Sequence, residues 1–164
     1  QAFPSFGSER TGAPVVAFCR MDDKEIRLRE PIMQPDAIII QDPTLLHQVD
    51  VFGGLKKEGY ILINTTRSFN EMGLTEFVKG FHAERLLTVP ATELALKHVG
   101  RPVPNVPLLG AFAALGGLIS LDAVQRAIDQ KFSGAVAKGN KAAAVEAYEI
   151  VMEQEKKAEE TQHA

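Results

Sequence analysis

The strongest constraint on the fold is a pattern repeated in the middle of the chain, in which a short apolar run leads into a helical segment. The runs cover residues 37–40, 60–64 and 85–90. A continuous apolar run of this length is typical of a strand buried on both faces, as in a parallel sheet. Three such units in succession predict right-handed crossovers and an open, mostly parallel α/β sheet flanked by helices.

Turn and capping residues give the expected ends of the helices. Asp42 is expected to cap a helix that starts at Pro43, and Gly53-Gly54 is expected to end it. Residues 74–81 predict a short second helix after a polar loop. A third helix over residues 91–99 is expected to stop at Gly100.

The two ends of the chain read differently from its middle. Residues 14–21 predict a strand, and residues 24–28 are expected to pair with it as an antiparallel hairpin. Three prolines in residues 101–107 predict a rigid connector. Two helices are expected next, an apolar one over residues 108–119 and one capped by Ser120, and an Ala/Glu/Lys-rich helix is expected from Asn140.

Size and charge favour one domain and exclude several classes of protein. We expect a single domain over residues 1–164, with a core in 1–135 and a C-terminal helix and tail in 136–164. The formal net charge is -3 with scattered basic residues, so neither nucleic-acid binding nor a polybasic membrane patch is expected. No apolar run approaches the ~20 residues of a membrane-spanning helix, and membrane insertion is not expected. Because the sequence starts at Gln1, we expect an N-terminal segment to be missing.

Cysteine and histidine usage argues against metal and disulfide chemistry within this chain. The single cysteine, Cys19, cannot form an internal disulfide or supply the usual four ligands of an iron-sulfur cluster, and it favours the cytoplasm. Alternation along its strand predicts a buried, inert thiol. The four histidines lack the i, i+4 spacing of a helical metal pair, and surface or helix-end positions are expected for them.

Ligands of open α/β sheets collect where loops leave the carboxyl ends of the strands. This rule indicates residues 42–43, 64–67 and 90–92. The most polar of these exits holds Asn64, Thr65 and Arg67, and Arg67 is suited to a phosphate or a carboxylate. The alternative is a solvated loop capped by its own Asn and Thr side chains. Both interpretations stay open.

The loop at the start of the chain offers a second candidate site. Hydroxyl groups and glycine-flanked amides there are suited to an anion, with Arg10 as its counter-charge. A structural turn in which Arg10 pairs with Glu9 is the slightly favoured alternative. The sequence contains none of the motifs GxGxxG, GxxxxGK[ST], CxxC or GxSxG.

Four segments taken in order carry a family resemblance. They are "AFPSFGSERTGAPVVAFCRMDDKEIR", "PDAIIIQDPTLL", "GYILINT" and "VPATELALKHVGRPVPNVPLLGAFAALGGLISLDAV". The chain resembles the gamma subunit of the pyruvate:ferredoxin oxidoreductase type of 2-oxoacid:acceptor oxidoreductases over residues 2–135. The C-terminal helix is similar only in character. In this family a first strand and a Gly-rich loop precede the segment matched by residue 2. The resemblance therefore implies that they are truncated here or supplied from elsewhere, and truncation is favoured because the sheet would otherwise expose an apolar edge.

The resemblance implies a non-catalytic subunit of an enzyme used in anaerobic metabolism. Such enzymes oxidatively decarboxylate a 2-oxoacid to an acyl-coenzyme A and pass electrons to ferredoxin or another acceptor. Thiamine diphosphate, Mg²⁺ and [4Fe-4S] clusters would then lie on partner alpha, beta and delta-type subunits. The loop "SFGSERTGAPV" favours a pyruvate-type enzyme, while a branched-chain or arylglyoxylate enzyme remains open. A free-standing α/β module that binds a nucleotide or another anion is the alternative function.

The resemblance also supplies candidate site residues. The resemblance implies that the opening loop faces the catalytic subunits. Together with the loop that follows residues 60–64, it is also a weaker candidate for binding coenzyme A. No catalytic or metal-binding residue is expected. The candidate cofactor-binding residues are Ser5, Phe6, Gly7, Ser8, Glu9, Arg10, Asn64, Thr65 and Arg67.

Overall fold

The computed structural model describes residues 1–5 and 12–162 of the chain. Its centre is a parallel sheet of three strands, β3 (Ala37–Ile40), β4 (Tyr60–Asn64) and β5 (Leu86–Val89), which lie side by side in that order. The register pairs Ala37 with Tyr60 and Ile61 with Leu86. The predicted open, parallel α/β sheet is therefore confirmed.

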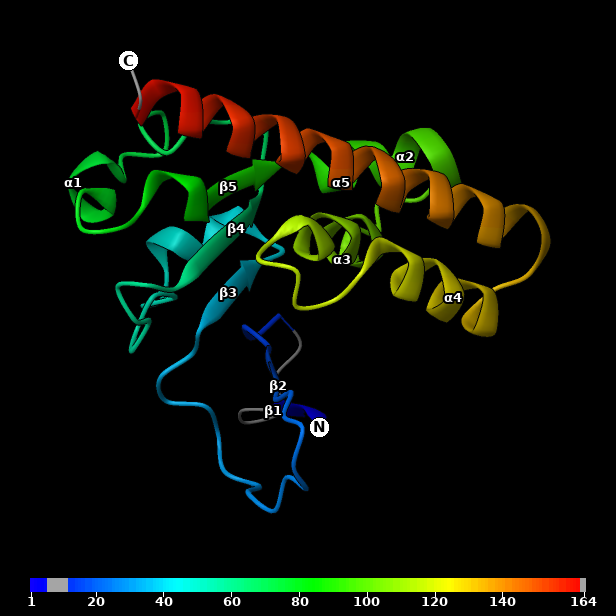
Figure 1. Cartoon of the computed structure of the whole chain (residues 1–164), viewed down its shortest axis with the longest axis horizontal. Helices are drawn as coiled ribbons and strands as arrows, with labels where there is room; N and C mark the ends of the chain where they lie inside the picture. The colour runs from blue at the N-terminus through cyan, green and yellow to red at the C-terminus, as the bar shows by residue number, and fades with distance from the viewer. Residues whose placement is uncertain (6–11, 163–164) are drawn as a thin grey trace.

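Helices connect the strands and follow them along the chain (Figure 1). A short 3-10 helix, η1, follows β3, and α1 and the 3-10 helix η2 lie between β4 and β5. Four longer helices follow β5. The helical elements are η1 (Pro43–His47), α1 (Thr75–Val78), η2 (Ala83–Arg85), α2 (Ala91–Val99), α3 (Asn105–Ala114), α4 (Leu121–Lys131) and α5 (Gly134–Gln162). None of the helices in the described ranges is long and apolar enough to cross a membrane.

Alternation of side chains along the strands divides the core between the two faces of the sheet. On one face, Leu62 and Leu87 pack with buried residues of α2, α3 and α5. On the other face, Ile61 and Ile63 pack with Met72 and with half-buried residues of the segments that connect the strands. β4 is the middle strand, and its residues 61–63 are completely buried, because helices or connecting segments cover both faces.

The C-terminal helix α5 belongs to the core of the protein. It crosses the molecule over α2 and α3 (Figure 1), and Ala144, Ala147 and Val151 on it are fully buried. Two glycines allow this close approach. A Cβ atom at Gly110 of α3 would lie 2.2 Å from the carbonyl oxygen of Ala144, and one at Gly139 would lie 2.3 Å from a carbonyl oxygen of α2.

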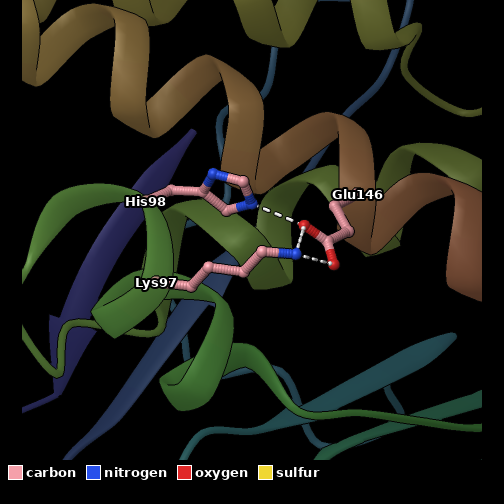
Figure 2. Close-up of polar contacts among 3 residues, drawn as sticks. All are labelled: Lys97, His98 and Glu146. Atoms are coloured by element: carbon pink, nitrogen blue, oxygen red, sulfur yellow. Dashed lines mark hydrogen bonds and ion pairs between the residues drawn. The ribbon is translucent and has the colours of Figure 1, made fainter.

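A cluster of three charged or titratable side chains joins the end of α2 to α5 (Figure 2). Lys97 Nζ donates to both carboxylate oxygens of Glu146, at 2.8 and 2.9 Å, and His98 Nε2 lies 2.5 Å from Glu146 Oε2. The hydrogen bond from Lys97, followed by that from His98, lowers the pKa of Glu146. The carboxylate therefore links two successive residues of α2 to one position on α5.

In the part of the chain that the structure describes, a side chain rather than another strand covers the outer edge of β5. Gln154 of α5 accepts a hydrogen bond from the backbone N–H of Thr88 at 3.2 Å and donates one to the carbonyl oxygen of Thr88 at 2.7 Å. Its amide thus makes the two bonds that a neighbouring strand would make. At the opposite edge of the sheet lies β3, on which Ile39 is 40% exposed.

A separate two-stranded antiparallel sheet precedes this body. It contains β1 (Ala2–Ser5) and β2 (Val16–Cys19), with Ala2 opposite Cys19. The prediction of an antiparallel hairpin near the N-terminus is confirmed. The prediction that residues 24–28 form its second strand is wrong, because β2 pairs with β1 instead. Residues 24–28 have no regular structure, and their side-chain ion pair between Arg27 and Glu25 is local.

The prediction of a buried thiol at position 19 is also wrong. Cys19 is exposed, because β2 packs mainly on β1 and neither face of this small sheet is covered by the core. Within the hairpin, the rings of Phe3 and Phe18 lie 5.4 Å apart. The guanidinium of Arg20 lies 5.8 Å from the ring centre of Phe3.

Several predicted helix boundaries are confirmed by their caps. The Asp42 carboxylate accepts from the N–H of Thr44 at 3.0 Å, with Pro43 first in η1. Ser120 Oγ accepts from the N–H of Ala123 at 3.0 Å. Gly100 ends α2 with φ +78°, a conformation that favours glycine.

Other boundaries differ from the prediction. The first helix ends at His47 rather than near residue 52, and a turn follows. α3 begins at Asn105, inside the predicted proline connector, because a proline in the first turn of a helix removes no helical hydrogen bond. α5 begins at Gly134 rather than Asn140.

Candidate functional site

The three strand exits of the parallel sheet meet at Asn64. The side-chain nitrogen of this residue donates to the carbonyl oxygen of Gln41, after β3, and to the hydroxyl of Thr92, in α2, each at 2.8 Å. Its side-chain oxygen accepts from the N–H of Thr92 at 3.2 Å. The two donated bonds use both amide hydrogens. Asn64 is 7% exposed. This buried side chain therefore connects the three strand exits to one another by hydrogen bonds.

A cavity of about 220 Å³ opens beside these exits. Its polar groups come from two of them: Thr44 and His47 from η1, which follows β3, and Thr65 and Arg67 from the loop after β4. Apolar side chains complete the wall, and Met72 among them is 6% exposed. The full lining is Pro43, Thr44, Leu46, His47, Thr65, Arg67 and Met72.

Local hydrogen bonds set the conformation of the loop that carries Arg67. The backbone N–H of Arg67 donates to the hydroxyl of Thr65 at 3.1 Å, and its guanidinium donates to the carbonyl oxygen of Glu71. The Glu71 carboxylate accepts from the N–H of Ser68 at 2.7 Å and from its hydroxyl at 2.8 Å. These bonds lower the pKa of Glu71. These local hydrogen bonds thus hold residues 65–71 in a compact loop beside the cavity.

The electrostatics of the cavity favour an anion or a polarised oxygen. Arg67 is charged at physiological pH, and no carboxylate side chain is among the residues that line the cavity. Asp42, which directly precedes the lining residues Pro43 and Thr44, has its pKa lowered by hydrogen bonds from the hydroxyl and N–H of Thr44. The hydroxyl of Thr65 and the guanidinium of Arg67 can donate hydrogen bonds to a phosphate or carboxylate, whereas the hydroxyl of Thr44 already donates its hydrogen to Asp42.

The structure brings together only part of the predicted set of site residues. Thr65 and Arg67 line the cavity, and Asn64 lies directly before them. Ser5 ends β1 in the hairpin and is not among the lining residues. The remaining predicted residues, Phe6, Gly7, Ser8, Glu9 and Arg10, lie outside the described residues.

Two polar residues of the cavity were missed from the sequence. His47 was expected to be only a surface or helix-end side chain, and Thr44 was assigned no role. The sequence did contain a signal for these two residues, since Asp42 and Pro43 were indicated as a strand exit. A helix that starts at Pro43 places His47 about one turn further along, next to the same exit.

Metal ligands do not gather in the part of the chain that the structure describes. Within residues 1–5 and 12–162, no group of three or more His, Cys, Asp or Glu residues is arranged to hold a metal ion. The one cysteine of the sequence is exposed on β2. These residues do not fit an iron-sulfur cluster or a magnesium diphosphate.

The fold and the cavity define an open-sheet α/β protein with a cavity, lined by both apolar and polar side chains, at the carboxyl ends of its parallel strands. Comparison with known proteins gives the family. The family model described as pyruvate ferredoxin/flavodoxin oxidoreductase matches residues 1–150. The chain belongs to this family, and the resemblance drawn from the sequence is confirmed.

Curated relatives carry the names of subunits. The chain is 45% identical over 149 residues to the "pyruvate/ketoisovalerate oxidoreductases common subunit gamma" of Pyrococcus furiosus, which covers 91% of this chain and 79% of the relative. It is 47% identical over 148 residues to the protein of the same name from Thermococcus kodakarensis, covering 90% and 78%. It is 44% identical to "pyruvate synthase subunit PorC" of Methanocaldococcus jannaschii, again covering 90% and 78%.

A solved structure supports the same relationship. The crystal structure of pyruvate oxidoreductase subunit PORC from Thermotoga maritima matches with a TM-score of 0.74 and 35% identity. The match covers 92% of this chain and 78% of that one. The relatives by sequence and by fold are therefore subunits of 2-oxoacid oxidoreductases.

Proposed function

We propose that this chain is the gamma-type subunit of a multi-subunit 2-oxoacid oxidoreductase. The observation that carries the proposal is the match, in sequence and in fold, to proteins named as gamma or PorC subunits over about nine tenths of this chain. The chain acts there as a structural subunit on the coenzyme A side of the enzyme. Cys19 forms no internal disulfide, in keeping with the cytoplasm as the proposed compartment.

The redox cofactors are assigned to the partner subunits. Thiamine diphosphate with Mg²⁺ would supply the decarboxylation chemistry, and [4Fe-4S] clusters would carry the electrons to ferredoxin or another acceptor. The described residues of this chain offer ligands for neither group. Partner subunits of the alpha, beta and delta types are therefore proposed to hold them.

Part of coenzyme A is the proposed ligand of the cavity. The Arg67 guanidinium and the hydroxyl of Thr65 suit a phosphate or a carbonyl oxygen, and Leu46 and Met72 suit an apolar chain. The volume of about 220 Å³ lies below the ~300–1,000 Å³ typical of sites for drug-sized ligands. Only one end of coenzyme A would enter, and the rest would lie on partner subunits or on the opening loop.

Pyruvate is the favoured 2-oxoacid. The relatives from Pyrococcus and Thermococcus are named for both pyruvate and ketoisovalerate, and that from Methanocaldococcus for pyruvate alone. A branched-chain 2-oxoacid such as ketoisovalerate is therefore the nearest alternative. The overall reaction is the oxidative decarboxylation of the 2-oxoacid with formation of an acyl-coenzyme A.

Assembly is tested first. The native chain, tagged and purified from its source, is expected to recover partner subunits that contain thiamine diphosphate and iron-sulfur clusters, as measured by mass spectrometry and by cofactor and metal analysis. A panel of 2-oxoacids on the same sample is expected to show the highest kcat/KM with pyruvate. Recovery of a lone monomer that binds a nucleotide or another anion would contradict the proposal and support a free-standing binding module.

The cavity is tested in the assembled enzyme. Arg67→Gln is expected to raise the apparent KM for coenzyme A about 10-fold or more at unchanged kcat, because a charge-assisted hydrogen bond contributes roughly 1.5–3 kcal/mol. Arg67→Lys keeps the charge and is expected to retain part of the affinity. Arg101→Gln is the matched control, since Arg101 is exposed and does not line the cavity. An unchanged KM in Arg67→Gln removes the cavity from the coenzyme A site.

A further inference from the structure

Among the histidines that the structure describes, His47 differs from the others in having no carboxylate partner. His82 Nε2 lies 3.0 Å from Glu58 Oε2. His98 Nε2 lies 2.5 Å from Glu146 Oε2 (Figure 2). The side chain of His47 makes no ion pair and no hydrogen bond with any other described residue. When it is protonated, its charge is therefore not balanced by a carboxylate within the described part of the chain.

The same imidazole lines the cavity beside the strand exits. His47 is the last residue of η1, and Arg67 lies in the loop after β4, so the two reach the cavity from different segments. Among the described lining residues, these two are the ones that can carry a positive charge. Two positive groups that border one small cavity are suited to an anion with two negative charges.

The carboxylates that flank His47 in the sequence are occupied by local hydrogen bonds. Asp42 accepts from the N–H of Thr44 at 3.0 Å and from its hydroxyl at 2.7 Å. Asp50 accepts from the N–H of Phe52 at 3.3 Å. Neither carboxylate is among the lining residues. The segment that carries the imidazole therefore supplies it with no counter-charge.

The charged groups that follow β4 are also paired with one another. Glu71 accepts from the N–H and the hydroxyl of Ser68, and the guanidinium of Arg67 donates to the backbone carbonyl oxygen of Glu71. In α1, Lys79 Nζ lies 2.6 Å from Glu76 Oε1. No carboxylate of this region lines the cavity, so an anionic ligand would supply the counter-charge for the imidazole.

The charge of an imidazole responds to pH and to bound anions. Histidine changes its protonation between about pH 5 and 8. An anion in the cavity favours the protonated form of His47, because opposite charges attract. By thermodynamic linkage, the proton then favours the anion by the same factor. The affinity of the cavity for an anion is therefore expected to fall as pH rises through this interval.

We propose that His47 and Arg67 together hold a phosphate group of coenzyme A and that its binding is coupled to the uptake of one proton from solvent by His47. This inference rests on the proposed function. A phosphate is preferred to the carboxylate of a 2-oxoacid because it carries between about one and a half and two negative charges near neutral pH. The competing explanation is that His47 only complements the end of η1, which predicts no effect on ligand binding.

The test measures binding of coenzyme A to the assembled enzyme by isothermal titration calorimetry, without a 2-oxoacid. Titrations in two buffers of different ionisation enthalpy give the number of protons taken up. At pH 7 the parent is expected to take up as much as about one proton more per site than His47→Gln. Between pH 6 and pH 8 its dissociation constant is expected to rise about 10-fold more than that of the variant, as for loss of a charged hydrogen bond.

Two further variants make the comparison specific. Comparison of parent and variant cancels any protons bound by the phosphate itself. His82→Gln is the matched control, since His82 is paired with Glu58 and does not line the cavity; it is expected to bind like the parent. His47→Lys fixes a positive charge and is expected to retain at pH 8 the affinity that the parent has at pH 6. Melting temperatures are expected to stay the same, because His47 makes no side-chain hydrogen bond with the described residues.

The outcomes separate this inference from the proposed function. If the unmodified chain recovers no oxidoreductase subunit, or Arg67→Gln binds coenzyme A as tightly as the parent, the proposed function fails. If Arg67→Gln weakens binding but His47→Gln takes up as many protons as the parent, with the same pH dependence, this inference alone fails. Displacement of coenzyme A by oxamate, an unreactive analogue of a 2-oxoacid, that is lost in His47→Gln would assign the cavity to a carboxylate and would also overturn it.

Discussion

Gly110→Ala is expected to destabilise the protein by about 2–4 kcal/mol, the range of a severe overpacking change. The added Cβ would lie 2.2 Å from the carbonyl oxygen of Ala144 and 2.6 Å from its Cα. Both are backbone atoms in the middle of α5, so no side chain can turn away to make room. Relief requires α3 and α5 to move apart, which opens gaps around Ala111 and Ala147, both fully buried.

Intrinsic helix preference works in the opposite direction and makes the test sharper. Alanine is favoured over glycine by about 1 kcal/mol in a helix interior, so a destabilised Gly110→Ala can only reflect the helix crossing. Gly80→Ala is the control, because a Cβ there has nothing within 4 Å. Equilibrium unfolding in urea measures both. Equal stability of the two variants would show that α5 does not pack on α3 as described.

Asn64→Asp is expected to destabilise the folded state by about 3–5 kcal/mol at neutral pH, as when a buried charge is left without a partner. The substitution keeps the size of the side chain and replaces its NH2 group by an oxygen. That oxygen would face two acceptors, the carbonyl oxygen of Gln41 and the hydroxyl oxygen of Thr92. Of these, only the hydroxyl can turn to donate.

The loss is expected to depend on pH with a definite sign. Burial without sufficient donors raises the pKa of the introduced carboxyl above its unfolded value. The folded variant then binds more protons than the unfolded one between these two pKa values. Its stability therefore falls as pH rises through that interval, and the deficit relative to the parent is smallest in acid. Thermal unfolding at several pH values between 4 and 8 measures it.

Asn70→Asp provides the matched control for this experiment. Asn70 is exposed, and its side-chain oxygen accepts a hydrogen bond from the hydroxyl of Thr75 at 2.7 Å. A carboxylate can accept the same bond, so little change in stability is expected. A pH-independent deficit in Asn64→Asp, or one matched by Asn70→Asp, would mean that Asn64 does not hold the three strand exits together.

Features encoded by neighbouring residues were predictable from the sequence. The three parallel strands follow from apolar runs, and the caps at Asp42, Ser120 and Gly100 follow from single side chains or a single glycine acting within a few residues. The family resemblance also rested on local segments in a fixed order. Each of these needs no knowledge of distant contacts.

Features that depend on distant contacts were not predictable. The partner of β2 lies before it in the chain, and the exposure of Cys19 depends on the absence of packing around a small sheet. The sequence predicted a C-terminal helix that ends in a solvated tail. It did not predict that alanines of α5 are buried against α3. A run of alanines has too little hydrophobic contrast to show which face will be covered.

The candidate site was predictable in outline. The rule that ligands bind at the carboxyl ends of parallel strands led to Thr65 and Arg67, which line the cavity. The same rule could not show that the side-chain amide of Asn64 donates both of its hydrogens within the fold, because the partners of these hydrogen bonds lie 23 and 28 residues away in the sequence. Which of several neighbouring polar residues stabilises the fold, and which of them lines the cavity, depends on tertiary structure.

The amide of Gln154 has a consequence for how the protein can polymerise. By occupying both backbone groups of Thr88, it prevents a foreign strand from continuing the sheet at β5. Among the described strands, the edge left for growth of the sheet in a misfolded aggregate or a domain-swapped chain is then that of β3, where Ile39 is partly exposed. A single glutamine on a distant helix thus gives the sheet one closed border and one border at which strand addition remains possible.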